Sequence, residues 1–160
     1  MQQWANYFIA TGTAAATLTG LIFLGVSLSL TRILEMNHLP GRALGSVVLL
    51  TNILIISSFC LIPGQPVFWL GCEISIIGVV LWVFLTRLAI KMHRNSLVEY
   101  RKYYVQNQLF TQAAIIPYLV AGVFLILKLN AGFYWLVPGI TFSFIKALVD
   151  SWVLLVEINR

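Results

Sequence analysis

Residues 7–30 read YFIATGTAAATLTGLIFLGVSLSL and contain no charged side chain. A helix needs about 20 apolar residues to cross a hydrocarbon core roughly 30 Å thick, and this segment is long enough. Four more segments of this kind follow, at residues 42–61, 67–85, 109–127 and 133–156. They are continuously apolar, whereas the strands of a membrane barrel are shorter and alternate in hydropathy. The sequence therefore predicts an all-α, polytopic membrane helix bundle with five transmembrane helices.

The composition of the whole chain supports this class. Of its 160 residues, 60% are hydrophobic and 9% are charged, against roughly 25% charged residues in an ordinary soluble domain. The mean hydropathy is +0.93. So few charges cannot cover a water-facing surface, and a disordered chain has low hydrophobicity and high charge. We expect residues 1–160 to form a single transmembrane domain with no separate soluble catalytic domain.

The basic residues are distributed unequally between the connections. Those on one side carry Arg32, Arg42, Arg87, Lys91, Arg94, Arg101, Lys102 and Arg160, and those on the other side carry only Lys128. Cytoplasmic connections are enriched in Lys and Arg, which predicts that the N-terminus lies outside and the C-terminus inside. This bias also accounts for the net charge of +5. Anionic lipid headgroups at the cytoplasmic face are therefore expected partners, and nucleic acid is not.

The connection between the third and fourth spans is predicted to be helical. Ser96 and Glu99 have the spacing of a capping box, in which each side chain satisfies a backbone N–H of the first helical turn. The fourth helix should then begin near residue 97, and the third should continue to about His93. We expect a cytoplasmic basic helical hairpin over about residues 86–108.

Two opposite charges occur inside the fifth span. A charge at the centre of a bilayer costs roughly 2.5–3.5 kcal/mol on insertion scales, so Lys146 and Asp150 require an explanation. They are four residues apart and share a helix face. Asn52 and Glu73 are expected at comparable depths, which predicts an intramembrane polar ladder of Glu73, Asn52, Lys146 and Asp150. Three interpretations stay open: a buried network that locks helix register, a route for protons or ions, and lipid-facing side chains that reach the headgroups.

Small residues recur at four-residue spacing in two spans. Such stripes let two helix backbones approach closely. The candidate helix-packing or oligomer-interface residues are Gly12, Ala16 and Gly20 in the first span and Gly139, Ser143 and Ala147 in the fifth. Packing within the chain, an interface between subunits, and a pore lined by the threonines of the first span are the alternatives.

The sequence predicts no catalytic residues, no metal site and no cofactor. His38 and His93 lack Cys, His or carboxylate neighbours at ligand spacing. Cys60 and Cys72 lie near the outer ends of adjacent helices, so a disulfide is geometrically feasible, although two free thiols are favoured. No Gly-rich phosphate loop and no nucleophile motif occurs. The chain is therefore not expected to be an enzyme.

Four stretches carry a resemblance: AAATLTGLIFLGVSL at residues 14–28, LPGRA at 39–43, LIPGQ at 61–65 and WVLLVEI at 152–158. Together they resemble a family of small bacterial inner-membrane proteins of unknown activity. Some of its members are labelled as modulators of a membrane-anchored AAA protease. The resemblance spans the whole chain, implies a bacterial inner-membrane location and brings no catalytic residues with it.

These observations predict a non-enzymatic, multi-pass inner-membrane protein. It would act by self-assembly, as a homo-oligomer, or by association with another membrane protein. The alternative is a small oligomeric channel or transporter subunit for ions or protons that uses the polar ladder.

Overall fold

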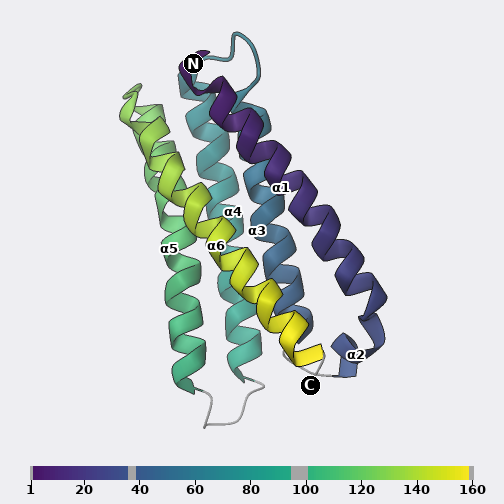
Figure 1. Cartoon of the computed structure of the whole chain (residues 1–160). Helices are drawn as coiled ribbons and strands as arrows, with labels where there is room; N and C mark the ends of the chain where they lie inside the picture. Colours follow the sequence, from purple (N-terminus) through teal and green to yellow (C-terminus); the bar gives the residue numbers. More distant parts are fainter. Residues whose placement is uncertain (1, 36–38, 95–100, 159–160) are drawn as a thin grey trace.

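The computed structural model describes residues 2–35, 39–94 and 101–158. These residues form six α-helices and no strand (Figure 1). The helices are α1 (Gln2–Leu28), α2 (Leu30–Glu35), α3 (Leu39–Cys60), α4 (Val67–Arg94), α5 (Arg101–Ile126) and α6 (Ala131–Ile158).

All helices except α2 are long and apolar enough to cross a membrane, and each contains or overlaps one predicted span. The prediction of an all-α chain with five such helices is confirmed for the described residues. The short α2 was not predicted, because the first span was expected to continue to residue 30. Instead, the Ser29 N–H donates to the carbonyl of Val26, three residues back rather than four. The helix tightens there and ends, and α2 begins in a new direction.

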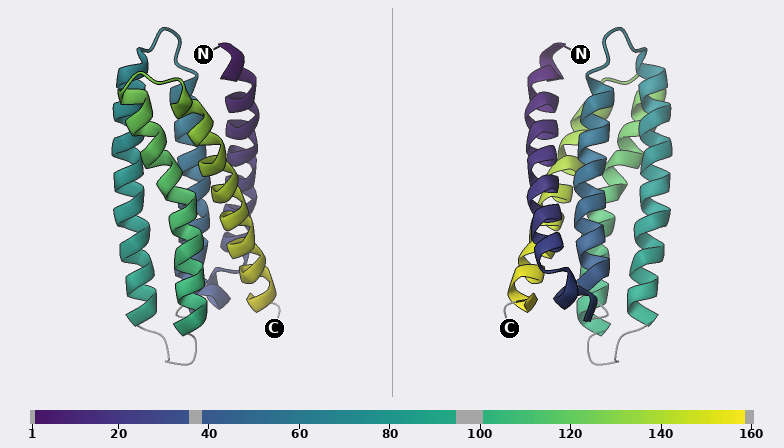
Figure 2. Two further views of the ribbon diagram at one scale, coloured as in Figure 1. Left: turned by 90° about the vertical axis from the view of Figure 1, so that its left-hand side faces the viewer. Right: turned by 90° about the vertical axis from the view of Figure 1, so that its right-hand side faces the viewer.

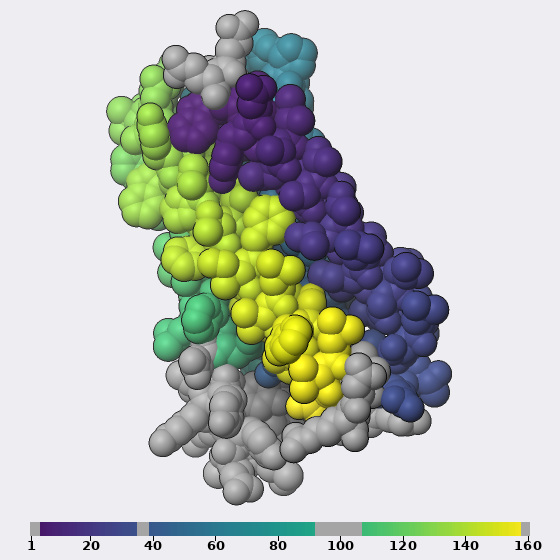
Figure 3. Space-filling view, viewed as in Figure 1, coloured from purple at the N-terminus to yellow at the C-terminus, as the bar shows by residue number. Residues whose placement is uncertain are grey.

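The five long helices run along a common axis, as the views in Figure 2 show. We call the end with the α3–α4 and α5–α6 connections the upper end, and the end with the start of α3 and the end of α6 the lower end, as in Figure 1. Contacts are most extensive between α4 and α5, followed by α5 with α6, α1 with α3, and α3 with α6. Helix α1 is therefore at an edge of the bundle, and with α6 it forms the face seen in Figure 3.

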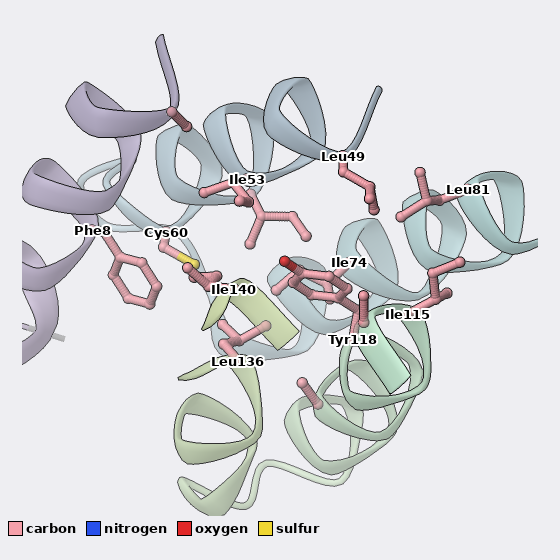
Figure 4. Packing of buried hydrophobic residues seen from close by; sticks show 14 of the residues in the cluster. Phe8, Leu49, Ile53, Cys60, Ile74, Leu81, Ile115, Tyr118, Leu136 and Ile140 are labelled. Atoms are coloured by element: carbon pink, nitrogen blue, oxygen red, sulfur yellow. The ribbon is translucent and has the colours of Figure 1, made fainter. Parts of the chain in front are cut away.

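Apolar side chains from all five long helices meet in one core (Figure 4). Tyr118 of α5 is fully buried at its centre, between Ile74 of α4 and Ile140 of α6. Helix α4 meets α5 and the core along a narrow seam of buried residues, which are Leu70, Gly71, Ile74, Gly78, Leu81 and Leu85. The rest of α4 is more exposed.

Glycines set how closely α4 and α5 approach. A Cβ at Gly71 would lie 2.6 Å from the backbone nitrogen of Ile126, and one at Gly122 would lie 3.0 Å from the backbone nitrogen of Ser75. The first distance is shorter than a Cβ tolerates and the second is at the lower limit of real Cβ contacts, so the two backbones approach this closely because both residues lack a side chain.

The predicted basic hairpin lies partly in the described residues. Helix α4 continues to Arg94, one residue beyond the predicted end at about His93, so that prediction is confirmed. The predicted helix start near residue 97 and the Ser96–Glu99 cap fall outside the described residues. Helix α5 is described from Arg101 onward.

Candidate functional site

The inner face of α6 carries the two charges of the fifth span. Buried residues recur along this helix at spacings of three and four, at Leu136, Gly139, Ile140, Ser143, Lys146, Ala147, Asp150 and Leu154. Lys146 and Asp150 therefore occupy positions of the core-facing stripe. Each is only 4% exposed, so neither side chain faces the outside of the bundle.

Lys146 and Asp150 form an ion pair in which the Lys146 ammonium donates to Oδ2 of Asp150. The other carboxylate oxygen, Oδ1, is buried and has no hydrogen-bond donor among the described residues. Burying a charge is unfavourable unless its hydrogen bonds are satisfied, so this pair is incompletely compensated by the protein.

A cavity of about 260 Å³ lies beside the ion pair. On the same measure a single water needs only about 10–15 Å³, so a small solute fits. The cavity is walled by α3, α4, α5 and α6, and its polar lining residues are Arg42, Asn107, Gln108, Thr111, Lys146 and Asp150. At 1.5 Å per helical residue from Ile158, Asp150 is about 12 Å and Lys146 about 18 Å inside the lower end of α6.

The polar lining is mixed in charge. Arg42 of α3 lies close enough to Lys146 to interact with it electrostatically. Oε1 of Gln108 is buried without a described donor, whereas the Thr111 hydroxyl donates to the carbonyl of Asn107 over 3.0 Å. Among the described residues, the wall thus combines two cationic side chains with one carboxylate.

Gly45 of α3 borders the open space of the cavity. It is buried and lines the cavity. A Cβ added at this position would have no other protein atom within 4 Å. A Cβ at Gly45 would therefore point into open space.

The predicted four-residue ladder is not continuous. Asn52 is 4% exposed and neither polar atom of its amide has a hydrogen-bond partner among the described residues. Glu73 instead accepts a hydrogen bond of 2.6 Å from Gln65, which belongs to the α3–α4 connection at the upper end. Neither Asn52 nor Glu73 lines the cavity. The structure therefore pairs Lys146 with Asp150, and it ties Glu73 to the opposite end of the bundle.

The predicted small-residue stripes have different environments. Gly139 packs beneath the ring of Tyr118, whose hydroxyl is 3.1 Å from that of Ser143. Ala147 is also fully buried, so the α6 stripe serves packing within the chain.

The α1 stripe is divided between two faces. Gly12 contacts Ser57 of α3, whereas Ala16 and Gly20 are exposed. Only part of the α1 stripe is therefore available to another molecule.

Sequence reasoning missed Arg42 and Gln108 as site residues. Arg42 was counted among the loop charges, although it follows the start of α3 by only three residues. Gln108 gave one usable signal, because it and Thr111 are polar residues three apart in one helix and so share a face.

Both cysteines are free thiols; Cys60 is buried and Cys72 half-buried. Within the described parts of the chain, no group of three or more His, Cys, Asp or Glu residues could hold a metal ion. Comparison of the chain with models of known families, with curated proteins and with solved structures gives no match. We therefore infer function from the cavity and the helices around it.

Proposed function

We propose that this chain is a multi-pass protein of a bacterial inner membrane that binds a small polar solute in the cavity beside Lys146 and Asp150, without chemically converting it. The observation that carries the proposal is a cavity of about 260 Å³ lined by the incompletely compensated ion pair of Lys146 and Asp150. An ion pair that only locks helix register is expected to have its oxygens satisfied by packed neighbours. An incompletely compensated ion pair whose residues line a cavity is typical of a binding site.

The position of the cavity favours a carrier or a receptor over an open pore through one subunit. The cavity occupies the lower half of the bundle, while the upper half is filled by apolar side chains such as Ile56, Leu70 and Leu136. Packed side chains therefore separate a solute in the cavity from the upper end of the bundle. In a carrier, a second conformation would be needed to open the upper half.

The charge distribution supports an orientation for the proposed protein. Among described residues, the exposed Arg32, Arg87 and Lys91 lie toward the lower end. By the positive-inside rule this end faces the cytoplasm and anionic headgroups. The cavity is then entered from the cytoplasmic side, and the N-terminus lies outside.

A cysteine at Gly45 tests access and orientation together. In a background with Cys60→Ala and Cys72→Ala, we expect Gly45→Cys to react with a small, charged, membrane-impermeant thiol reagent. Reaction should occur in inside-out vesicles and not in intact cells, because the proposed entrance is cytoplasmic. The readout is the mass shift of the purified protein.

Ile53→Cys provides the matched control, since Ile53 lies on the same helix and is fully buried in the apolar core. The binding proposal fails if Gly45→Cys is no more reactive than Ile53→Cys both in inside-out vesicles and in intact cells. If Gly45→Cys reacts in intact cells alone, the binding proposal stands and the proposed orientation in the membrane is reversed.

Self-association is a second candidate function, favoured by the exposed part of the α1 stripe. A Cβ added at Gly20 would have no other protein atom within 4 Å, so a second helix can approach the backbone closely there. We expect Gly20→Leu to lower the oligomer fraction measured by mass in detergent at least several-fold. Ala14→Leu, also exposed but on a different side of α1, should have little effect. A purely monomeric unmutated protein would refute this candidate.

A further inference from the structure

We infer that the ligand of the cavity is a single-chain amphiphile with an acidic head group, which enters from the membrane through an opening between α4 and α5. This inference rests on the proposed function and adds the chemical class of the ligand and its route of entry. Three features of the cavity carry it: a wall with an apolar and a polar side, the position of Ile90 on that wall, and the cationic side chains of Arg42 and Lys146.

The wall of the cavity has an apolar side and a polar side. The lining residues of α5 and α6 are all polar or charged, whereas those of α4 are all apolar, namely Leu85, Leu88, Ala89 and Ile90. Most of the surface that the wall exposes to the cavity is apolar. A purely polar solute would place its hydrogen-bonding groups against that surface, which is unfavourable. A ligand that combines a polar head group with an alkyl chain matches both sides.

The cavity extends around the side of α4. Leu88, Ala89 and Ile90 are consecutive, and all three line it. At 3.6 residues per turn, three consecutive residues span about 200° of a helix, so at least one of them faces sideways or outward. Ile90 is 61% exposed, whereas Leu85 of the same wall is buried. The wall therefore runs along α4 from the core to the outside of the bundle.

The opening lies just below a hydrogen-bonded contact between α4 and α5. The indole N–H of Trp82 donates to Oε1 of Gln112 over 2.8 Å, and Nε2 of Gln112 donates to the Thr86 hydroxyl over 3.4 Å. Ile90 follows Thr86 by four residues, so it lies one turn nearer the lower end on the same face of α4. Gln108 precedes Gln112 by four residues and has the equivalent position on α5. Both Ile90 and Gln108 line the cavity, which therefore reaches the α4–α5 seam one turn below this contact.

A neighbouring charge places the opening at the surface of the membrane. Lys91 directly follows Ile90 and is exposed, and a lysine ammonium at the end of a span is solvated by water or lipid headgroups. In the proposed orientation this is the cytoplasmic surface. The head group of an amphiphile dissolved in that leaflet lies at the same level, so it can pass between the helices and its chain can follow.

The cationic side chains favour an acidic head group. Arg42 and Lys146 both line the cavity and are close enough to interact electrostatically. Lys146 is paired with Asp150, whereas Arg42 forms no ion pair with a carboxylate of the described residues. The guanidinium of Arg42 is a planar fork of donors that suits a carboxylate or a phosphate. An acidic group beside Arg42 would also relieve its repulsion from Lys146.

The size of the cavity favours one alkyl chain over two. Its volume of about 260 Å³ is slightly below the roughly 300–1,000 Å³ of pockets that enclose drug-sized ligands. A diacyl phospholipid is larger than such ligands, whereas a fatty acid is not. A long-chain carboxylate is therefore the simplest molecule with the inferred chemistry.

Photolabelling of the full-length protein in phosphatidylcholine vesicles tests this ligand class. The probe is dodecanoate with a photoreactive diazirine at the end of its chain, and the readout is the mass of the labelled peptides. We expect labelling of the α4 wall, residues 85–90, and excess unlabelled dodecanoate should lower it at least several-fold. Dodecylamine, dodecanol and butanoate should compete poorly, because the amine has the opposite charge, the alcohol has no charge and butanoate has no long chain.

Matched substitutions on α4 connect the labelling to the opening. Ile90→Trp places a bulky ring at the exposed edge of the cavity and should abolish the labelling that dodecanoate competes for. Val80→Trp is the control, because Val80 is similarly exposed on the same helix and does not line the cavity. Neither ring has to enter the packed core. Arg42→Gln should raise the dodecanoate concentration needed for competition at least several-fold.

The outcomes separate the ligand class from the proposed function. Equal competition by dodecylamine or dodecanol would overturn the acidic head group, and equal competition by butanoate or by diacyl phosphatidylglycerol would overturn the single chain. Unchanged labelling of Ile90→Trp would overturn the route of entry. If no labelling is competed for while Gly45→Cys keeps its reactivity, the ligand class is wrong and the binding proposal survives. If Gly45→Cys is unreactive, the binding proposal itself fails.

Discussion

Gly71→Ala is expected to destabilise the bundle by about 3 kcal/mol. The new Cβ would lie 2.6 Å from the backbone nitrogen of Ile126 and 2.9 Å from the carbonyl carbon of Leu125. Both contacts are with backbone atoms near the end of α5, so no side chain can rotate away. The helices must separate and lose close packing along their shared seam, and overpacking of this kind typically costs roughly 1–3 kcal/mol. The measurement is the midpoint of thermal unfolding in a fixed detergent.

Gly25→Ala is the matched control, because a Cβ at Gly25 meets no side chain and no atom of another helix within 4 Å. Alanine is favoured over glycine in a helix by roughly 0.5–1 kcal/mol, so this variant should gain stability. The two substitutions should therefore shift Tm in opposite directions. Similar shifts for both would mean that α4 and α5 are not packed as closely as described.

Lys146→Met and Asp150→Asn should each cost roughly 3–5 kcal/mol, while the double variant should recover most of that loss. Either single change leaves one polar partner buried and uncompensated, and both residues are only 4% exposed. The double variant removes both charges and keeps similar side-chain volumes. Tm and the yield of folded protein are the measurements.

Lys91→Met controls for the loss of a positive charge as such. Lys91 is exposed near the lower end of α4, where water or headgroups solvate its ammonium. Its replacement should change stability by less than about 0.5 kcal/mol, as usual for exposed positions. A large loss at Lys91, or harmless single changes at the ion pair, would contradict the burial of Lys146 and Asp150.

Much of the fold was predictable because the length of each apolar segment indicates the approximate length of one helix. Each long helix matches one apolar segment, and α4 ends within a residue of the expected position. The short α2 was not predictable in this way. It results from a local change in hydrogen bonding at Ser29, and residues 28–31 remain apolar or weakly polar on either side of that break.

The candidate site was predictable only in part. The four-residue spacing of Lys146 and Asp150 on one helix, together with the cost of isolated charges, was enough to predict their mutual contact. Depth along a helix was not enough to place Glu73, because equal heights on two helices do not make two side chains meet. Its partner is Gln65 of a connecting segment.

The sequence by itself determined the number of long helices, their approximate ends and the pairing of two charges within one helix. These properties depend on apolar length and on the 3.6-residue period of a single helix. Only the tertiary structure decided that Gly12 faces α3 while Gly20 faces outward, and that Arg42 and Gln108 join Lys146 and Asp150 around one cavity. Those properties depend on how each helix is rotated about its axis and where packing leaves space. Many side chains on several helices set that rotation together, and no single segment encodes it.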